Sequence, residues 1–247
     1  MPDYNDSFSD EYIQTKYAEV HYRLHAGSGK KVIFLHGLSG STKVWTRLVA
    51  DLEDEIEIYL FDLLGHGKTS APEGSYDVDM QVLMLEEAIR KLKIGAPFVF
   101  GHSYGGWVAA LYAARNNAYS GLILEDSAGL EEYMTELASG RDPAANKEEL
   151  VRASRVLGSD KMVVDSFLDS LTSADTLDSR SLAMIKKPTA IIWGSEDKRI
   201  PLAYGRLFSE RIPGSRLYVI NGAGHSPHYT NHIEVAEVLS EFLSEVD

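Results

Sequence analysis

The stretch Val99–Trp107, with the sequence VFGHSYGGW, decides the fold. An apolar, strand-like segment runs here into the pattern G-x-S-x-G and then into a helix of small residues. A serine between Gly101 and Gly105 lies on a turn that is too tight for side chains at the flanking positions. Such a turn lifts the Ser103 hydroxyl above a sheet, where a base and a substrate can both reach it. The stretch therefore predicts a strand–turn–helix unit with Ser103 as a nucleophile.

An acid and a histidine each follow a later apolar strand. A serine nucleophile needs a base, and the base needs a group that orients it. Residues 189–193 read as a buried strand, and Asp197 lies in the loop that follows, while His225 lies in the loop after the next strand. Open α/β sheets carry their chemistry at the carboxyl ends of the strands, and the chain order Ser, Asp, His is typical of this serine turn. We predict Ser103, Asp197 and His225 as a catalytic triad.

Two backbone N–H groups are predicted to stabilise the negative charge that such a reaction develops. Residues 31–35 form an apolar strand that leads into the loop 36–41 (HGLSGS), where the N–H of Leu38 is available. The second donor is the N–H of Tyr104, because this residue begins the helix after the serine and the helix dipole adds positive potential there. Each such donor stabilises a transition state by about 3 kcal/mol. Leu38 and Tyr104 thus form the predicted oxyanion hole.

Five blocks of the sequence resemble the α/β-hydrolase superfamily, in particular its small single-domain esterases. They occur in the family's order and with family-like spacing: HGLSGS followed by Trp45, DLLGHGKTS (62–70), GHSYGG (101–106), GSEDKRIP (194–201) and GAGHSPH (222–228). The resemblance implies a doubly wound, mostly parallel β-sheet and an acyl-enzyme mechanism. It also implies Asp126 as an alternative acid, because some members carry the acid after the earlier strand. The spacing within GSEDKRIP favours Asp197 instead.

Strands and helices alternate along most of the chain, as expected for a parallel sheet with helices on both faces. Residues 17–25 alternate like a strand and are expected to form a hairpin with 31–35. Segment 129–187 breaks the alternation with helical patterns and no clear strand. It lies where the family inserts a helical cap before the acid-bearing strand. We therefore expect a cap at 129–187 on an α/β core made of 1–128 and 188–247.

Three apolar residues of the predicted cap are candidates for the substrate pocket. Met134, Leu137 and Phe167 have the helical spacing of core residues, whereas caps of the family line the acyl pocket with such side chains. Both interpretations stay open at this point. The small size of the cap favours small or medium substrates over long-chain lipids.

Composition limits the partners and the compartment. The net charge of −13 disfavours binding to nucleic acid or to anionic membranes. The chain has no cysteine, which excludes disulfides and a cysteine nucleophile and fits a reducing compartment. The polar N-terminus shows no signal-peptide pattern, and no run approaches the ~20 apolar residues of a membrane span. We expect a cytoplasmic protein without a membrane partner, and its oligomeric state stays open.

The eight histidines of the chain need to be told apart. Only His225 directly follows the G-A-G loop, and the resemblance implies that His36 and His66 hold loops together. His102 is the variable residue of the serine turn. No H-x-H or H-E-x-x-H pair is present, and scattered histidines without carboxylate partners argue against a metal. We expect neither a metal nor a cofactor.

The expected reaction is the hydrolysis of carboxylic esters with small to medium acyl chains, with a small-molecule ester as substrate. The alternatives within the same fold are a carbon–carbon bond hydrolase, a thioesterase, an aminopeptidase and a non-catalytic ligand receptor. Carbon–carbon hydrolases of ring-cleavage products tend to carry tryptophan after the catalytic histidine, whereas Ser226 stands here. A receptor is disfavoured because no member of the predicted triad is missing.

Overall fold

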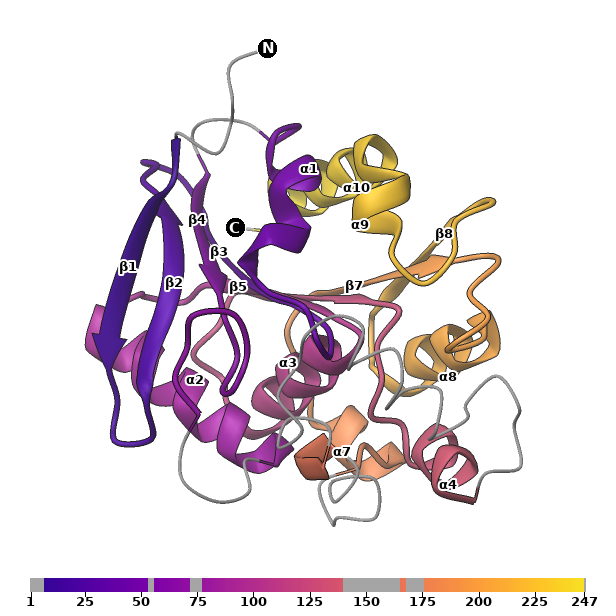
Figure 1. Cartoon of the computed structure of the whole chain (residues 1–247). Coiled ribbons are helices and arrows are strands. Elements are labelled where there is room, and N and C mark those ends of the chain that lie inside the picture. The colour runs from indigo at the N-terminus through magenta and orange to yellow at the C-terminus, as the bar shows by residue number, and fades with distance from the viewer. Residues whose placement is uncertain (1–6, 53–55, 72–76, 140–164, 168–175, 247) are drawn as a thin grey trace.

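The computed structural model describes residues 7–52, 56–71, 77–139, 165–167 and 176–246. Within them, eight strands form one sheet in the order β1-β2-β4-β3-β5-β6-β7-β8 (Figure 1). The strands are β1 (Ser9–Gln14), β2 (Glu19–His25), β3 (Lys31–Leu35), β4 (Glu57–Phe61), β5 (Phe98–His102), β6 (Gly121–Glu125), β7 (Thr189–Gly194) and β8 (Arg216–Ile220). All pairings from β4 to β8 are parallel, and those of β2 with β1 and β4 are antiparallel. The predicted mostly parallel sheet is confirmed.

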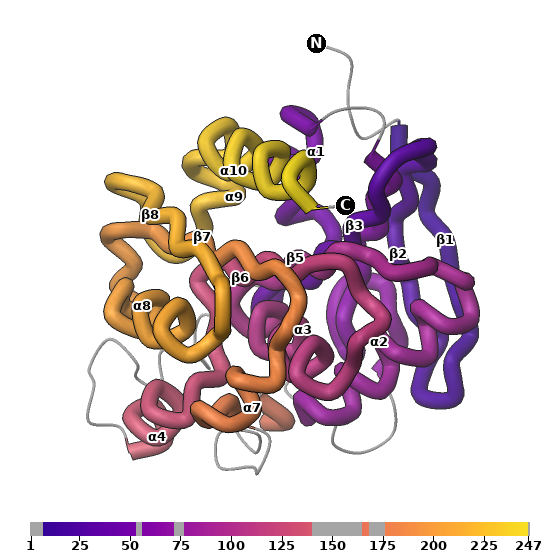
Figure 2. Tube along the Cα trace, turned by 180° about the vertical axis from the view of Figure 1, so that it is seen from behind, coloured from indigo at the N-terminus to yellow at the C-terminus, as the bar shows by residue number. Residues whose placement is uncertain are grey.

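Helices cover both faces of the sheet (Figures 1 and 2). On one face lie the 3-10 helix η2 (Thr42–Trp45), α1 (Thr46–Val49) and α10 (His232–Glu245), and on the other lie α2 (Val78–Leu92), α3 (Tyr104–Arg115) and α8 (Leu202–Arg211). Each layer buries its own hydrophobic cluster against the sheet: Trp45, Leu239 and Phe242 belong to one, and Trp107 and Phe208 to the other. The central strands are buried on both faces and are apolar without alternation, as in other covered parallel sheets.

The predicted hairpin between residues 17–25 and 31–35 is wrong. β2 pairs with β1 on one side and with β4 on the other, so β3 is not its neighbour. β3 is buried over Val32–Leu35, and it lies between β4 and β5, where helices cover both of its faces. β2 forms its hairpin with β1 instead. Thr15 closes the turn between these two strands, because its Oγ1 donates to the carbonyl of Ala18 and accepts the N–H of Ala18.

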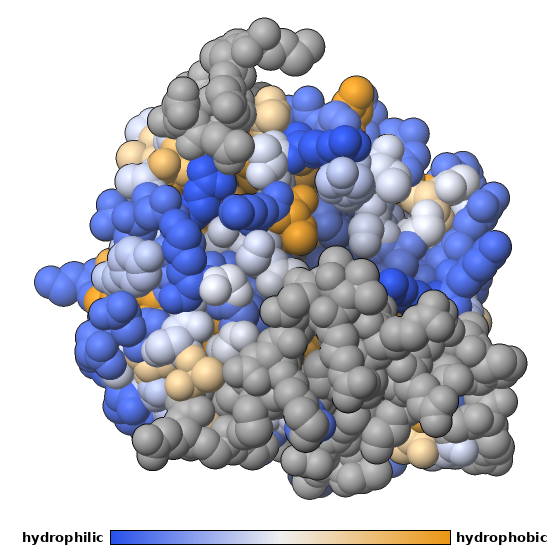
Figure 3. All heavy atoms as spheres, in the orientation of Figure 1, coloured by the Kyte–Doolittle hydropathy of each residue, from blue (hydrophilic) through white to orange (hydrophobic). Residues whose placement is uncertain are grey.

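Figure 3 shows a mainly hydrophilic described surface on the face that it presents, with small hydrophobic groups between. Among the described helices, none combines the length and the apolar composition that a membrane span requires.

Most of the predicted cap, 129–187, lies outside the described residues. Its described parts are the beginning, with α4 (Glu131–Ser139), the short piece 165–167, and the end, with α7 (Ser179–Ala183). The two ends are joined, because the N–H of Leu177 donates to the carbonyl of Gly129 at 2.7 Å and the N–H of Glu131 donates to the carbonyl of Leu177 at 3.2 Å. The chain thus returns to the core beside the point where it left.

Candidate active site

Ser103 lies on a sharp turn between β5 and α3. Its φ of 52° and ψ of −114° place a non-glycine residue in an uncommon backbone conformation. Two close approaches explain the flanking glycines: a Cβ on Gly101 would lie 2.3 Å from the carbonyl oxygen of Gly105, and a Cβ on Gly105 would lie 2.2 Å from that of Leu35. The Ser103 N–H donates to the carbonyl of Glu125 at 2.9 Å, which ties the turn to β6.

The structure brings the three predicted triad residues together. His225 Nε2 lies 3.0 Å from Ser103 Oγ, and His225 Nδ1 lies 2.7 Å from Asp197 Oδ2. A carboxylate only accepts, so Nδ1 carries the proton and Nε2 is left to accept the serine hydroxyl. The other Asp197 oxygen accepts the N–H groups of Arg199 at 2.7 Å and Ile200 at 3.0 Å. Three N–H donors therefore hold the acid in position behind the base.

The loop after β3 lies against Ser103, as expected for the oxyanion hole. Leu38 and Tyr104 both line the cavity that contains Ser103. His36 holds this loop in place, because its Nδ1 donates to the carbonyl of Gly37 at 2.8 Å and its Nε2 accepts the N–H of Leu63 at 3.2 Å. Burial lowers the pKa of His36, which keeps the ring neutral and able to act as both donor and acceptor.

A cavity of about 480 Å³ lies above Ser103. Phe167 lines it, as does Tyr133 from α4. Met134 and Leu137 are buried in the hydrophobic cluster beside α3 and are not among the described residues that line the cavity. Of the three predicted pocket residues, the structure therefore brings only Phe167 to the site.

Residues 32–238 match the sequence model of the alpha/beta hydrolase family. The chain is a member of this family. It is similar to 2-hydroxy-6-oxo-6-(2'-aminophenyl)hexa-2,4-dienoic acid hydrolase of Metapseudomonas resinovorans, with 24% identity over 96% of this chain and 92% of the relative. It is also similar to monoacylglycerol lipase ABHD6 of Bos taurus, with 24% identity over 91% and 78% of the two chains. The structure of a thermophilic esterase from Thermogutta terrifontis has a TM-score of 0.78 and 21% identity, covering 96% of this chain and 98% of that one.

The alternative acid, Asp126, is also close to the predicted triad of this alpha/beta hydrolase. Oxygen atoms of Asp126 and Asp197 and a ring nitrogen of His225 lie within 4.8 Å of one another. Asp126 directly follows β6, with a φ of 43°, and its Oδ1 accepts the N–H of Gly194 at 3.0 Å. The hydrogen bond from His225 goes to Asp197. Burial raises the pKa of Asp126 well above its ordinary value, and the charges of Glu125 and Asp197 raise it further.

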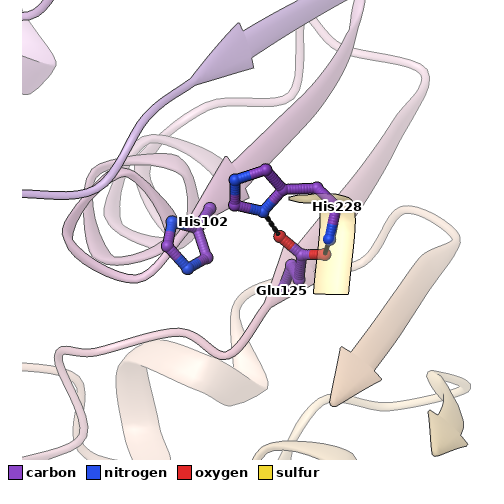
Figure 4. Close-up of side chains that lie close together, drawn as sticks. All are labelled: His102, Glu125 and His228. Atoms are coloured by element: carbon purple, nitrogen blue, oxygen red, sulfur yellow. Dashed lines mark hydrogen bonds and ion pairs between the residues drawn. The ribbon is translucent and has the colours of Figure 1, made fainter. Parts of the chain in front are cut away.

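A second buried histidine–carboxylate pair in the hydrolase lies next to the first. Figure 4 shows the carboxylate of Glu125 directed at His228, with His102 to one side. Glu125 accepts the His228 backbone N–H at 2.8 Å and contacts its Nδ1 at 2.5 Å. His102 donates from Nε2 to the carbonyl of His225 at 2.6 Å. Burial, with His228 and His225 nearby, holds the pKa of His102 well below its ordinary value. The neutral His102 ring therefore fixes the backbone of His225.

The premise that the histidines lack carboxylate partners is wrong. Among the described residues, five histidines have a carboxylate nearby: His21, His36, His225, His228 and His232. Within the described ranges, two groups of residues bring possible metal-ligand atoms within 4.8 Å of one another: His102, Glu125 and His228, and Asp126, Asp197 and His225. In the first, both oxygens of Glu125 are already hydrogen-bonded to His228. The expected absence of a metal stays a prediction.

Proposed function

We propose that this alpha/beta hydrolase cleaves carboxylic esters with small to medium acyl chains through a serine nucleophile. One observation carries the proposal: the continuous hydrogen-bonded line from Ser103 Oγ through His225 to Asp197, with the serine facing a cavity. This line gives the hydroxyl a base, and gives the base a group that fixes its tautomer.

Each residue of the line has a distinct role in the proposed reaction. His225 Nε2 takes the hydroxyl proton while Ser103 Oγ attacks the acyl carbon, and the N–H groups of Leu38 and Tyr104 receive the developing oxyanion. The protonated His225 then gives its proton to the leaving alcohol, and Asp197 stabilises the charged ring meanwhile. Water attacks the acyl-enzyme by the same route and releases the acid.

The size of the cavity supports small or medium substrates. A volume of about 480 Å³ lies in the lower half of the range for small-molecule sites, roughly 300–1,000 Å³. Its apolar walls include Val44, Tyr133, Phe167 and Ile200, which suit an acyl chain.

A carbon–carbon bond hydrolase acting on an acidic substrate is the second candidate. The similarity to the Metapseudomonas resinovorans acid hydrolase extends over 96% of the chain. In addition, Arg199 lines the cavity, and no aspartate or glutamate is among the described residues that line it. Ser226, directly after His225, argues for the ester reaction.

Hydrolysis of p-nitrophenyl esters from acetate to dodecanoate near neutral pH tests the proposal, with Ser103→Ala as the control. We expect turnover that peaks at short or medium chains and falls by about 10⁴-fold or more in the variant, as when a triad member is removed. Labelling of Ser103 by a fluorophosphonate should disappear in the same variant. Full ester turnover by Ser103→Ala would exclude the serine mechanism.

A further inference from the structure

Two buried carboxyl groups face each other behind His225. Asp126 follows the end of β6 and Asp197 follows the end of β7, and neither is appreciably exposed. Oxygen atoms of the two side chains and a ring nitrogen of His225 lie within 4.8 Å of one another. Two ionised carboxylates are both acceptors and repel each other in a buried site, so a proton on one of them would stabilise the pair.

The hydrogen bonds around the two groups differ sharply. Asp197 accepts three N–H groups, from Arg199, Ile200 and the His225 ring. From the described residues, Asp126 accepts one N–H group, that of Gly194, at its Oδ1. Its Oδ2 is buried, and no N–H or O–H group of the described residues donates to it. The anion is therefore stabilised at Asp197, and Oδ2 of Asp126 is left as the place for the proton.

The surrounding charges point the same way. Glu125 and Asp197 both lie close enough to Asp126 to disfavour a further negative charge there. Burial acts in the same direction, and together they raise the pKa of Asp126 well above its ordinary value. In the part of the chain that the structure describes, the Gly194 N–H is the group that stabilises the Asp126 anion.

We propose that Asp126 is a protonated, neutral carboxylic acid whose Oδ2–H donates to the carboxylate of Asp197 and so positions the acid that orients His225. The place of the proton does not depend on the proposed function, whereas the effect on His225 rests on it. A neutral donor holds the Asp197 carboxylate without adding a second negative charge beside the base. Asp126 is thus a positioning residue.

The variant Asp126→Asn imitates the proposed state. Its amide oxygen can accept the Gly194 N–H, and its NH₂ group can donate to Asp197, as the protonated acid does. Infrared difference spectra between the wild type and Asp126→Asn near neutral pH should show the loss of a C=O stretch from a protonated carboxyl group. Asp62→Asn is the matched control, because Asp62 is also buried but accepts the N–H groups of Thr42 and Lys68 and contacts His21. The C=O stretch of the protonated carboxyl group should persist in Asp62→Asn.

The pH profile of kcat/KM for p-nitrophenyl acetate gives a second readout. Asp126→Asn should leave the acid limb unchanged, whereas Asp126→Leu, which has neither donor nor acceptor, should lower kcat by tenfold or more. If Asp126 were ionised, removing its charge beside His225 would move the acid limb to lower pH by about one unit or more. Such a shift, or a carboxyl band that persists in Asp126→Asn, would overturn the proposal. The infrared result holds whether or not esters are the substrate, so it separates this proposal from the proposed function.

Discussion

The backbone at Ser103 depends on its two glycine neighbours, and Gly105 is the more constrained because a Cβ there meets the backbone of β3. We expect Gly105→Ala to lower the free energy of unfolding by about 3 kcal/mol, since the carbonyls of Leu35 and His36 cannot move without displacing a central strand. Urea denaturation followed by circular dichroism measures the change.

Gly95→Ala is the control for this substitution. A Cβ on Gly95 has no atom within 4 Å, so its stability should be nearly that of the wild type. Equal losses in the two variants would show that the close approach at Gly105 is not what constrains the turn.

The juxtaposition of the three predicted triad residues could be predicted from the sequence because each one follows an apolar strand within a few residues. Local pattern thus places Ser103, Asp197 and His225 at one edge of the sheet. The pair of Glu125 and His228 could not be predicted in this way, because these residues are 103 positions apart and Glu125 ends a strand whose other residues are apolar. Their contact exists only once β6 and the loop after β8 are both in place.

At the level of elements, the contact of Glu125 with His228 joins β6 to α9 (Pro227–Thr230), the helix that directly follows His225. Removing the carboxylate leaves a buried imidazole and a backbone N–H without their partner. We expect Glu125→Ala to cost about 3 kcal/mol of stability. A double-mutant cycle with His228→Ala should give a coupling of about 1–3 kcal/mol, measured by denaturant unfolding.

The same variants report on the active site. Loosening α9 should slow the reaction of Ser103 with a fluorophosphonate in Glu125→Ala. Additive losses of stability in the cycle would show that the two side chains do not interact.

Helix α4 directs some side chains into the core, such as Met134, and others into the cavity, such as Tyr133. Met134 is buried without lining the cavity, so Met134→Ala should destabilise the protein by about 2–3 kcal/mol and leave the acyl-chain preference unchanged. Phe167, outside this helix, lines the cavity, and Phe167→Ala should move the preference towards longer chains by about tenfold in kcat/KM ratios. Activity on the ester series measures the acyl-chain preference of both variants, and denaturant unfolding measures the stability of Met134→Ala. An altered preference in Met134→Ala would place that residue in the pocket.

The arrangement of the first strands could not be read from their sequences. Alternation within residues 17–25 predicts a strand correctly, but neighbours along the chain need not be neighbours in the sheet. β1 was not predicted because most of its residues are polar, as in many edge strands, and four of its six positions are exposed. β3 takes the interior place because it is apolar on both faces, and this displaces it from β2.

Over the whole molecule, the stability should fall with acidification because buried histidines must stay neutral. Burial, with His36 nearby, lowers the pKa of His66 from 6.5 to about 3. The unfolded chain therefore binds a proton at His66 below pH 6.5, whereas the folded chain binds it only near pH 3. The contribution of His66 is complete above pH 6.5 and decreases by about 1.4 kcal/mol for each pH unit below it.

Unfolding free energies at pH 6.5 and pH 5 test this expectation. His66→Gln, which does not titrate, should lose about 2 kcal/mol less than the wild type over this interval. An identical pH dependence in both proteins would mean that His66 is protonated in the folded state.

The mostly parallel sheet brings the loops that carry Ser103 and His225 to one edge. They can meet there only after the C-terminal part of the chain has been synthesised. Ser103 and His225 are 122 residues apart, and the histidine follows β8, which comes last in the sequence among the described strands. At a synthesis rate of about 5–20 residues per second, the serine emerges roughly 6–24 s before the histidine that is proposed as its base. During that interval the hydroxyl has no group to take its proton, so a nascent chain should carry an inert serine. Reactivity would then mark the moment when the last part of the sheet has been added.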